Sequence, residues 1–360
     1  MLAMCAAAQS PLERAVALAR EKHYAEAHKL LEGVAEPPGT EPRIAFHRLK
    51  AAIASGLGDA GTAADEMRSA LALAPADSGL LLAAAAAESQ AGRWDDALLH
   101  ARGAGNSALA QALIGDIQEK RGEYVEAAQA YQAAVALAPD REQYRIALAL
   151  EFVEHQTFEP AIAVLQQAAP RFPKSAKIRV LLGIAQYALG QVDDAATSLT
   201  DAIAVDPNLE PAYAYLAQIA LESAAAPPPR TLDALCGWNV TACNGLKLRV
   251  ARESDNAALR REAIEALKRA PAESAMARCE LGRAYEWSGQ WTEARAQMEA
   301  CVRLDPSPQH HYRLGLIYNH LGLADLARRQ MELRDAANQR MSEEVARREK
   351  AVQTFQYLLK

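Results

Sequence analysis

The chain has 360 residues and a net charge of −6, an acidic balance that argues against a nucleic-acid binder, because such proteins normally carry a basic stripe. Its longest apolar run, residues 80–87, is well short of the roughly 18 residues that cross a bilayer, so we expect no integral membrane span. The apolar half of the composition is mostly Ala and Leu, the strongest helix formers, and this predicts an all-α protein.

Within residues 1–9, Met1 to Ala8 are apolar, uncharged and rich in Ala, and they precede Gln9, Ser10 and Pro11. This pattern is typical of the end of a secretory signal whose charged start is missing, which would make the protein exported or periplasmic in a bacterium. An Ala-rich, frayed terminus is the alternative, and it would fit a cytoplasmic protein equally well. Cys5 fits a lipoprotein signal poorly, because Met4 stands where such signals carry a small residue.

A period of 34 residues organises the next segment, 10–223. Proline recurs at Pro139, Pro173 and Pro207, where it prevents each preceding helix from continuing. An aromatic or aliphatic residue lies 15 positions before each proline, and an alanine follows three positions later. These pairs are Tyr124 with Ala127, Phe158 with Ala161, and Val192 with Ala195. A fixed period of this length is the signature of stacked repeats.

A glycine precedes the bulky residue by two positions in several copies, at Gly92, Gly122, Gly190 and Gly289, and Gly322 stands in the same place before Ala324. We expect this glycine to make the turn between two antiparallel helices. The small residues beyond it let the two helix axes approach closely. Because one helix pair cannot bury its apolar face alone, neighbouring pairs must stack, which predicts an α-solenoid.

The period breaks twice. At residues 103–106 the sequence Gly-Ala-Gly-Asn ends a helix early, and we expect a local kink there. The larger break follows Pro207: residues 211–222 are expected to form a first helix and residues 257–270 its partner. Between them, residues 224–256 form an insertion that opens with three prolines, and we expect it to emerge as a loop on one face.

The insertion contains Cys236 and Cys243, seven residues apart. In an oxidising compartment a disulfide would close this segment and stabilise it by about 2–3 kcal/mol. Two free thiols, or half of a metal site, are the alternatives, although no second pair of ligands lies nearby in the sequence. Cys279 and Cys301 fall on the two helices of a later repeat. We expect them to be small buried side chains in place of alanine rather than a bonded pair.

The repeats resume over residues 257–334 and lead into a charged tail, residues 335–360. In this tail Met341, Val345, Val352, Phe355 and Leu359 form one apolar stripe at helical spacing. Such a helix suits a cap that covers the last repeat and turns a polar face outward. A dimerisation helix is the alternative, so we expect either a monomer or a weak homodimer.

The histidines give no clear site: His310, His311 and His320 are scattered and are expected to be surface residues. We find no catalytic triad, no zinc-protease motif and no phosphate-binding glycine loop. We therefore expect a protein that is not an enzyme and that has no catalytic residue, cofactor or metal.

The spacing pattern resembles the tetratricopeptide repeat family. The best copy runs from Ala275 to Pro306 and matches the family's signature at Leu281, Gly282, Tyr285, Gly289, Trp291, Ala294, Met298 and Cys301. Copies that start near residues 108, 142 and 176 are good, and those near 44, 78 and 308 are degenerate. The resemblance implies a right-handed superhelix of antiparallel helix pairs, a TPR-like fold.

The resemblance also implies a concave groove lined by the first helix of each pair. The matching residues are Arg48, Leu82, Asp116, Glu119, Lys120, Ile146, Leu150, Lys177, Tyr187, Gln218, Arg283, Glu286, Tyr312 and Asn319. Some family members grip a peptide carboxylate with Lys, Asn and Arg at fixed positions. Here those positions hold mostly Ala, Leu, Ile and Val, which argues against a carboxylate clamp.

We therefore expect a scaffold or adaptor that binds a peptide or partner helix in the groove, through aromatic and Arg anchors. Two alternatives remain. The groove residues could pack only against one another, or the chain could be a structural subunit of a larger assembly, possibly in the envelope, that uses its capping helix or inserted loop as the contact.

Overall fold

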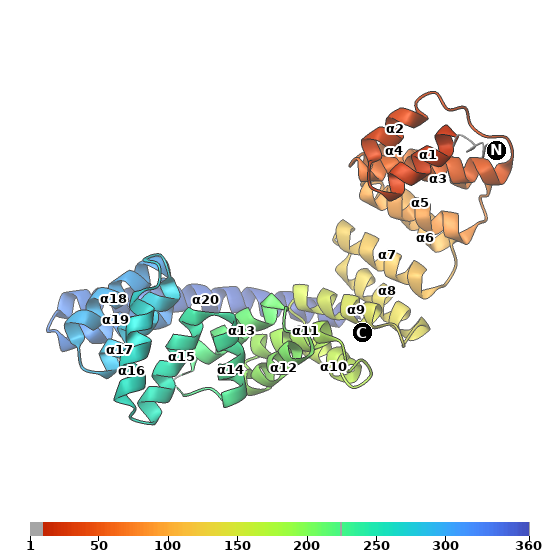
Figure 1. Cartoon of the computed structure of the whole chain (residues 1–360). Coiled ribbons are helices and arrows are strands. Elements are labelled where there is room, and N and C mark those ends of the chain that lie inside the picture. The colour runs from red at the N-terminus through yellow and green to blue at the C-terminus, as the bar shows by residue number, and fades with distance from the viewer. Residues whose placement is uncertain (1–9, 224, 360) are drawn as a thin grey trace, which may run out of the picture. The chain divides into compact units, whose positions relative to one another are not determined.

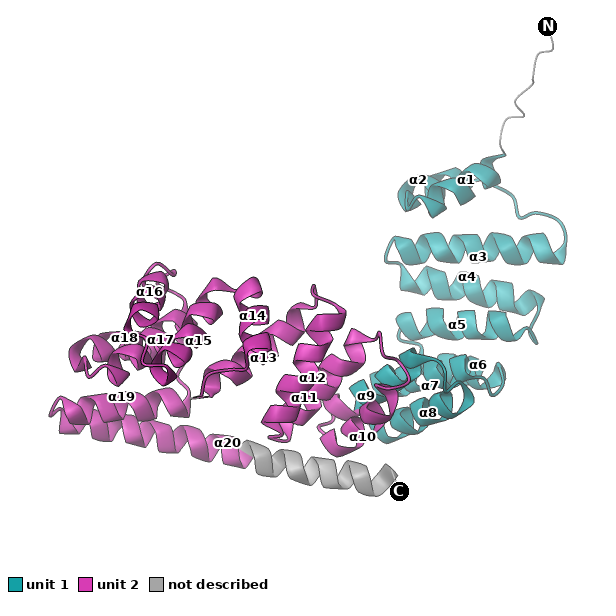
Figure 2. Ribbon diagram, turned by 60° about the horizontal axis from the view of Figure 1, so that its bottom comes forward, with its two compact units in different colours: residues 1–151, 359 teal, residues 152–358, 360 magenta. Residues whose placement is uncertain are grey.

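The computed structural model describes residues 10–223 and 225–359, with side chains described as far as residue 343. The described residues form helices joined by short turns, with no strand among them (Figure 1). They divide into two compact units, one ending at Glu151 and the other beginning at Phe152 (Figure 2). The expected signal remnant, residues 1–9, lies outside the described residues.

Unit 1 is a series of helical hairpins in chain order. Its helices are α1 (Pro11–Arg20), α2 (Tyr24–Leu31), α3 (Thr40–Gly56), α4 (Ala60–Leu73), α5 (Ser78–Gln90), α6 (Trp94–Gly103), α7 (Ala108–Arg121), α8 (Tyr124–Leu137) and the larger part of α9 (Glu142–Glu154). The first helix of each hairpin packs on the second, and α2, α4 and α6 each pack on the helix that follows. The expected all-α stack of antiparallel pairs is confirmed.

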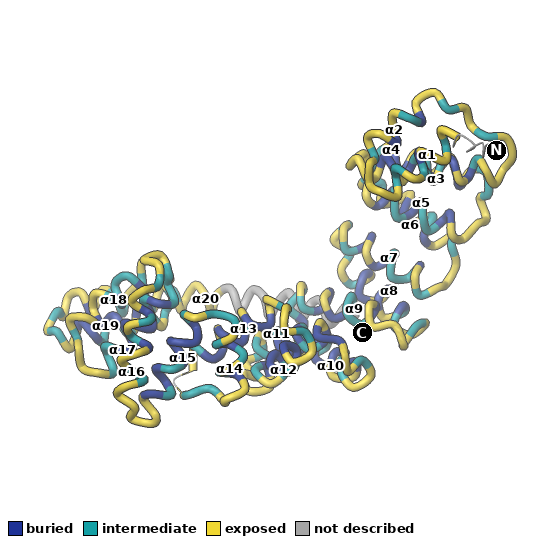
Figure 3. Tube along the Cα trace, viewed as in Figure 1, coloured by how far each residue is buried: buried dark blue, intermediate teal, exposed yellow. Residues whose placement is uncertain are grey.

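Unit 2 continues the same scheme. It contains α10 (Phe158–Ala168), α11 (Ala176–Ala188), α12 (Val192–Val205), α13 (Glu210–Glu222), α14 (Pro229–Trp238), α15 (Val240–Glu253), α16 (Ala257–Lys268), α17 (Ala275–Trp287), α18 (Trp291–Leu304), α19 (Pro308–His320) and α20 (Ala324–Leu359). Buried and exposed residues alternate along each helix (Figure 3), so one face of each helix lies in the core. Within the described residues, none of these helices has both the length and the hydropathy of a bilayer span.

Among the described residues, the turns of nine hairpins share one backbone conformation. A residue with positive φ stands two positions before the second helix begins, and this is the left-handed region that favours glycine. The five glycines expected at this place all adopt it, with φ between 68° at Gly289 and 77° at Gly122. Gly58 does so as well, at 81°. Three hairpins place a residue with a side chain there: Lys22, Gln156 and Asp255, with φ of 63°, 57° and 48°.

The small residues in the middle of the first helices allow close approach, as expected. A Cβ added to Gly183 in α11 would lie 2.7 Å from Cγ of Leu199 and 3.2 Å from the carbonyl oxygen of Ala195, both in α12. At Gly282 in α17 the same atom would lie 2.8 Å from Cε of Met298. No real Cβ makes contacts below 3.0 Å, so these glycines set the distance between the paired helices.

The structure differs from the expected insertion at residues 224–256. Most of this segment is helical and forms α14 and α15, which belong to two successive hairpins. The segment 257–270, expected to pair with the helix at 211–222, packs instead on α15, while α13 packs on α14. The physical reason is local: Asn239 caps α15 by accepting hydrogen bonds from the backbone amides of Thr241 and Ala242, and Asp255 makes the hairpin turn.

The last hairpin contains the start of the expected capping helix. The second helix of this hairpin and the predicted tail helix form one continuous helix, α20. Ala327 is buried against α19, Cε of Met331 lies over Gly315, and Gln330 is hydrogen bonded to His311. Of the expected apolar stripe, only the Met341 side chain is described, and it is exposed; the side chains of the other four residues lie outside the described set.

Candidate functional site

A cavity of about 680 Å³ in unit 2 lies among helices of three hairpins, α13–α14, α17–α18 and α19–α20. Its walls come from α13, α14, α17, α19 and α20, together with the turn before α19. Three of these helices, α13, α17 and α19, are first helices of their hairpins. The lining includes Gln218 and Arg283, two residues predicted for the partner groove. We call this cavity the unit 2 groove.

A buried ionic cluster supports one wall of the unit 2 groove. Arg249 in α15 donates to both carboxylate oxygens of Glu280 in α17, at 2.7 Å and 3.2 Å. Arg283 donates to the same carboxylate at 3.2 Å and to the carbonyl oxygen of Leu221 at 2.6 Å. All three ionic side chains are more than nine-tenths buried. One carboxylate thus holds two guanidinium groups at the C-terminal end of α13, where cations are favoured.

One polar atom of the Arg283 side chain makes no hydrogen bond. Its Nε is buried and has no hydrogen-bond partner in the structure. Burial, opposed by the charge of Glu280, lowers the pKa of the Arg283 guanidinium from its usual value. Glu280 and Arg283 both line the unit 2 groove, so its inner wall is charged and rigidly held.

A second polar group stands at the α13 side of the groove. The Tyr187 hydroxyl donates to the Glu222 carboxylate at 2.9 Å, and the Gln218 amide donates to both of these partners. Burial and the hydrogen bond to Glu222 raise the pKa of Tyr187 to about 12. Tyr187 is therefore a neutral hydroxyl that holds Gln218 and Glu222 in place.

The rest of the lining includes aromatic and apolar side chains. The Trp238 ring stacks on Tyr213 with ring centroids 5.7 Å apart, and its indole nitrogen donates to Glu210 at 2.9 Å. Met276 and Met341 also line the groove. Methionine side chains are flexible and polarisable, so such a wall can adapt to an apolar side chain of a ligand. The disulfide of Cys236 with Cys243, which has a Cα separation of 4.4 Å, joins α14 to α15 beside Trp238.

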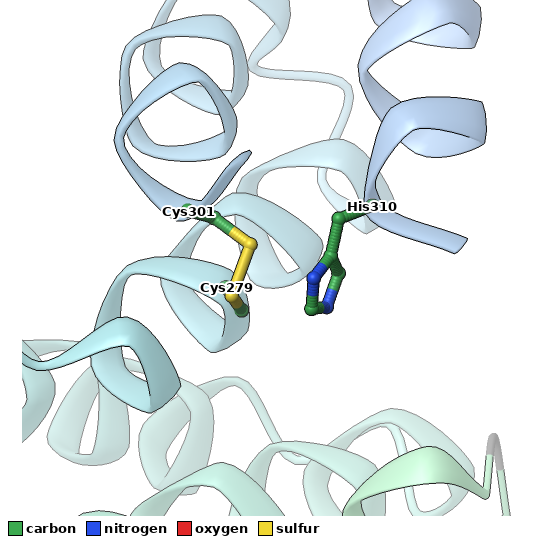
Figure 4. Close-up of side chains that lie close together, drawn as sticks. All are labelled: Cys279, Cys301 and His310. Atoms are coloured by element: carbon green, nitrogen blue, oxygen red, sulfur yellow. A yellow bond between two sulfur atoms is a disulfide. The ribbon is translucent and has the colours of Figure 1, made fainter. Parts of the chain in front are cut away.

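Asp305 and His310 line the groove where α18 passes into α19. Nδ1 of His310 lies 3.1 Å from the carbonyl oxygen of Asp305 and 3.3 Å from its carboxylate. Beside the imidazole, Cys279 and Cys301 form a second disulfide, with a Cα separation of 4.8 Å (Figure 4). The expectation of separate buried thiols differs from this structure, because close packing of α17 on α18 brings the two Cα atoms within bonding range.

Comparisons with known proteins agree with the repeated helical hairpins. Models of the tetratricopeptide repeat match residues 110–143, 152–219 and 279–340. The chain contains tetratricopeptide repeats. Members of this family are generally non-enzymatic and bind proteins or peptides, so at this level the chain is a protein-interaction scaffold. The search of curated proteins gave no match.

Several solved structures are similar to the chain. A tetratricopeptide protein from Cytophaga hutchinsonii shares 16% identity over 82% of this chain and 95% of its own, with a TM-score of 0.45. A tetratricopeptide repeat protein from Parabacteroides merdae shares 14% identity over 79% of this chain and 98% of its own, with a TM-score of 0.42. YrrB, described as a TPR protein with an unusual peptide-binding site, shares 17% identity over 52% of this chain and 96% of its own, with a TM-score of 0.40.

The tetratricopeptide positions predicted for unit 1 lie on its first helices, apart from the unit 2 groove. Arg48 is exposed on α3, and Lys120 on α7 donates to the hydroxyl of Ser89 at 3.2 Å. Asp116 and Glu119 accept hydrogen bonds from the Tyr131 hydroxyl at 2.7 Å and 3.5 Å. These contacts are made within unit 1. Three further predicted positions, which are apolar, also lie on first helices there: Leu82, Ile146 and Leu150.

The remaining tetratricopeptide positions in unit 2 do not line its cavity. Lys177 is exposed in the first turn of α11, and Asn319 is exposed near the end of α19. Glu286 forms an ion pair with Arg313 at 3.0 Å. The exposed ring of Tyr312 lies under the Arg334 guanidinium, 5.6 Å from the ring centroid. The structure therefore brings Gln218 and Arg283 to one cavity, with Tyr187 beside them.

Sequence reasoning missed several residues of the groove. Trp238 was assigned to a loop, and Glu280 and Arg249 were not noticed as a pair. Asn338 lines the groove from α20, in a segment interpreted as a cap or a dimerisation helix. Asn239, a strong helix N-cap residue, was the available signal that a helix begins beside Trp238. His311, expected at the surface, is buried, with a ring nitrogen 2.7 Å from Oε1 of Gln330.

Proposed function

We propose that the chain is an adaptor that binds an extended or helical segment of a partner protein in the unit 2 groove. The observation that carries the proposal is the cavity of about 680 Å³, because it combines an apolar wall with fixed polar groups. Peptide-binding sites use this combination: apolar pockets supply affinity, and a few held polar groups set register and direction.

The chemistry of the walls describes the segment that fits. Trp238, Met276 and Met341 favour an apolar or aromatic side chain. Gln218, held by Tyr187 and Glu222, offers donors and acceptors to a peptide backbone. Arg283 on the inner wall is held by Glu280, so it is ordered before a partner arrives. A site that is already ordered loses less entropy on binding.

The test uses a library of random peptides displayed on phage, selected on the intact chain, followed by affinity measurement with synthetic peptides. Ala214 lines the groove and is exposed, so Ala214→Trp would fill the cavity without removing a core contact. We expect selected peptides to bind in the micromolar range and Ala214→Trp to weaken them at least tenfold, about 1.4 kcal/mol.

Ala136→Trp is the matched control, since Ala136 is an exposed residue of α8 in unit 1. It should leave the affinity unchanged. Selected peptides that bind Ala214→Trp as tightly as the unaltered chain would place the binding surface elsewhere. A folded chain that selects no peptide would contradict the proposal altogether.

A further inference from the structure

Two sulfur atoms and an imidazole meet where the α17–α18 hairpin adjoins α19. Cys279 lies on α17, Cys301 on α18 and His310 on α19. The two sulfurs and one imidazole nitrogen all lie within 4.8 Å of one another (Figure 4). Cys279 and Cys301 are buried, and His310 is partly buried on the wall of the unit 2 groove.

We propose that Cys279, Cys301 and His310 form a zinc site in the reduced chain, and that the disulfide is its metal-free, oxidised state. Thiolate and imidazole are the ligands that Zn²⁺ prefers, whereas Mg²⁺ and Ca²⁺ prefer oxygen. Two Cys and one His leave one position of a tetrahedron for a further ligand.

The required movements are small. Zinc lies about 2.3 Å from a thiolate and about 2.0–2.1 Å from an imidazole nitrogen, so two tetrahedral thiolates stand roughly 3.8 Å apart. The sulfurs, 2.10 Å apart in the disulfide, must therefore separate, and the farthest pair of ligand atoms must close by about 1 Å. Rotation about the side-chain bonds of the three residues supplies both changes, because the backbones already face one another.

The surroundings of His310 suit a metal ligand. Both the carbonyl and the carboxylate of Asp305 lie near Nδ1 of the ring and can fix its orientation. Outer groups that orient a ligating histidine are a regular part of zinc sites. Asp305 and His310 also line the groove, which gives an entering ion a path and leaves the fourth position open to water.

Oxidation state controls whether the site exists. A dithiol reductant delivers two electrons and two protons to the disulfide and becomes a disulfide itself, while Cys279 and Cys301 become thiols. Binding of Zn²⁺ then releases the two thiol protons to solvent, because the thiolate is the ligand. Oxidation by a disulfide reverses the reaction and expels the ion. The reduced chain therefore binds zinc, and the oxidised chain does not.

The experiment uses the full chain with Cys5, Cys236 and Cys243 changed to Ser, so that Cys279 and Cys301 are its only thiols. After reduction with a phosphine and removal of metal, it is titrated with Co²⁺, whose visible spectrum reports tetrahedral thiolate binding, and then with Zn²⁺. We expect one ion per chain, Co²⁺ bands that Zn²⁺ abolishes, and no binding before reduction.

His310→Ala should weaken Zn²⁺ binding roughly tenfold or more and alter the Co²⁺ bands. His320→Ala is the matched control, since His320 is an exposed histidine on the same helix, stacked on Trp291, and should change neither property. Circular dichroism of each variant checks that the helices remain.

Three results would overturn the zinc site: a reduced chain that binds no Zn²⁺, binding that survives His310→Ala unchanged, or thiols that appear only when the helical signal is lost. None of these results bears on peptide binding in the groove, which is measured separately on the oxidised chain.

Discussion

At three hairpin turns, a residue with a side chain adopts a backbone conformation that glycine adopts at six others. For residues other than glycine, this left-handed conformation is unfavourable by about 1–2 kcal/mol, since Cβ approaches the following carbonyl oxygen. Lys22 is the simplest case, because its side chain is exposed and its φ is 63°. The packing of the two helices requires this turn conformation, and the residue at this position adopts it whether or not it is glycine.

Replacing Lys22 with glycine should therefore stabilise the α1–α2 hairpin. We expect the free energy of unfolding to rise by about 0.5–1 kcal/mol, because the relief of backbone strain outweighs the extra conformational entropy that glycine gives the unfolded chain. Amide hydrogen exchange in α1 and α2 would measure it as slower exchange. Lys22→Ala removes the same side chain but keeps the strained φ, so it should give no gain. Equal effects of the two substitutions would contradict this explanation.

Gly183 illustrates the opposite constraint, close packing within a helix pair. Gly183→Ala should destabilise unit 2 by about 1–3 kcal/mol, because the new methyl group would overlap Leu199 and crowd the Ala195 carbonyl. Urea denaturation would show a lower midpoint. Gly237→Ala is the control, since nothing lies within 4 Å of a Cβ built there, and its midpoint should stay nearly unchanged. A tolerated Gly183→Ala would mean that α11 and α12 can move apart freely.

At the scale of the helix, the periodicity of the sequence predicted the regular hairpins well and the irregular hairpins poorly. The pattern of glycine, bulky residue and alanine placed α7 with α8 and α17 with α18, because close packing restricts those positions to few residue types. The α15–α16 hairpin was missed because Asp255 stands where glycine was sought, and the three prolines before α14 suggested a loop. Gln218 and Arg283 could be predicted from repeat positions. The ion pair of Arg249 with Glu280 could not, because it joins two helices of different hairpins.

That ion pair gives a prediction about how the helices are held. Glu280→Gln should destabilise unit 2 by about 3–5 kcal/mol, because it leaves two guanidinium groups buried without their counter-charge. Chemical denaturation of the purified variant would measure the loss. Glu265→Gln, which removes an exposed partner of Lys268, should leave stability nearly unchanged. If both variants have the same stability, the buried carboxylate is not what balances Arg249 and Arg283.

At the scale of the whole molecule, each hairpin packs mainly on its neighbours in the chain. The stability of such an array is the sum of the stability of each repeat and of the interfaces between neighbouring repeats. A local defect therefore destabilises the adjacent hairpins most. The fold is thus repeated along the chain, whereas the binding site that we propose lies in unit 2 alone. Oligomeric state and export remain predictions from the sequence.

Hydrogen exchange followed by mass spectrometry measures how far along the chain a substitution destabilises the hairpins. In Gly183→Ala we expect faster exchange in α10–α13 and unchanged exchange in α1–α6, because several hairpins separate the two segments. The unaltered chain under the same conditions supplies the reference. A uniform loss of protection along the chain would show that the array unfolds as a single cooperative unit.

The disulfide of Cys279 with Cys301 has a mechanical consequence. It closes a segment with a sequence separation of 22 residues, which includes parts of two paired helices. If the chain were stretched from its two ends, the force would bypass this segment through the sulfur–sulfur bond. An extended residue contributes at most about 3.3–3.6 Å, so the fully stretched chain would be roughly 70 Å shorter while the bond is intact. Reduction under load would release that length in one step.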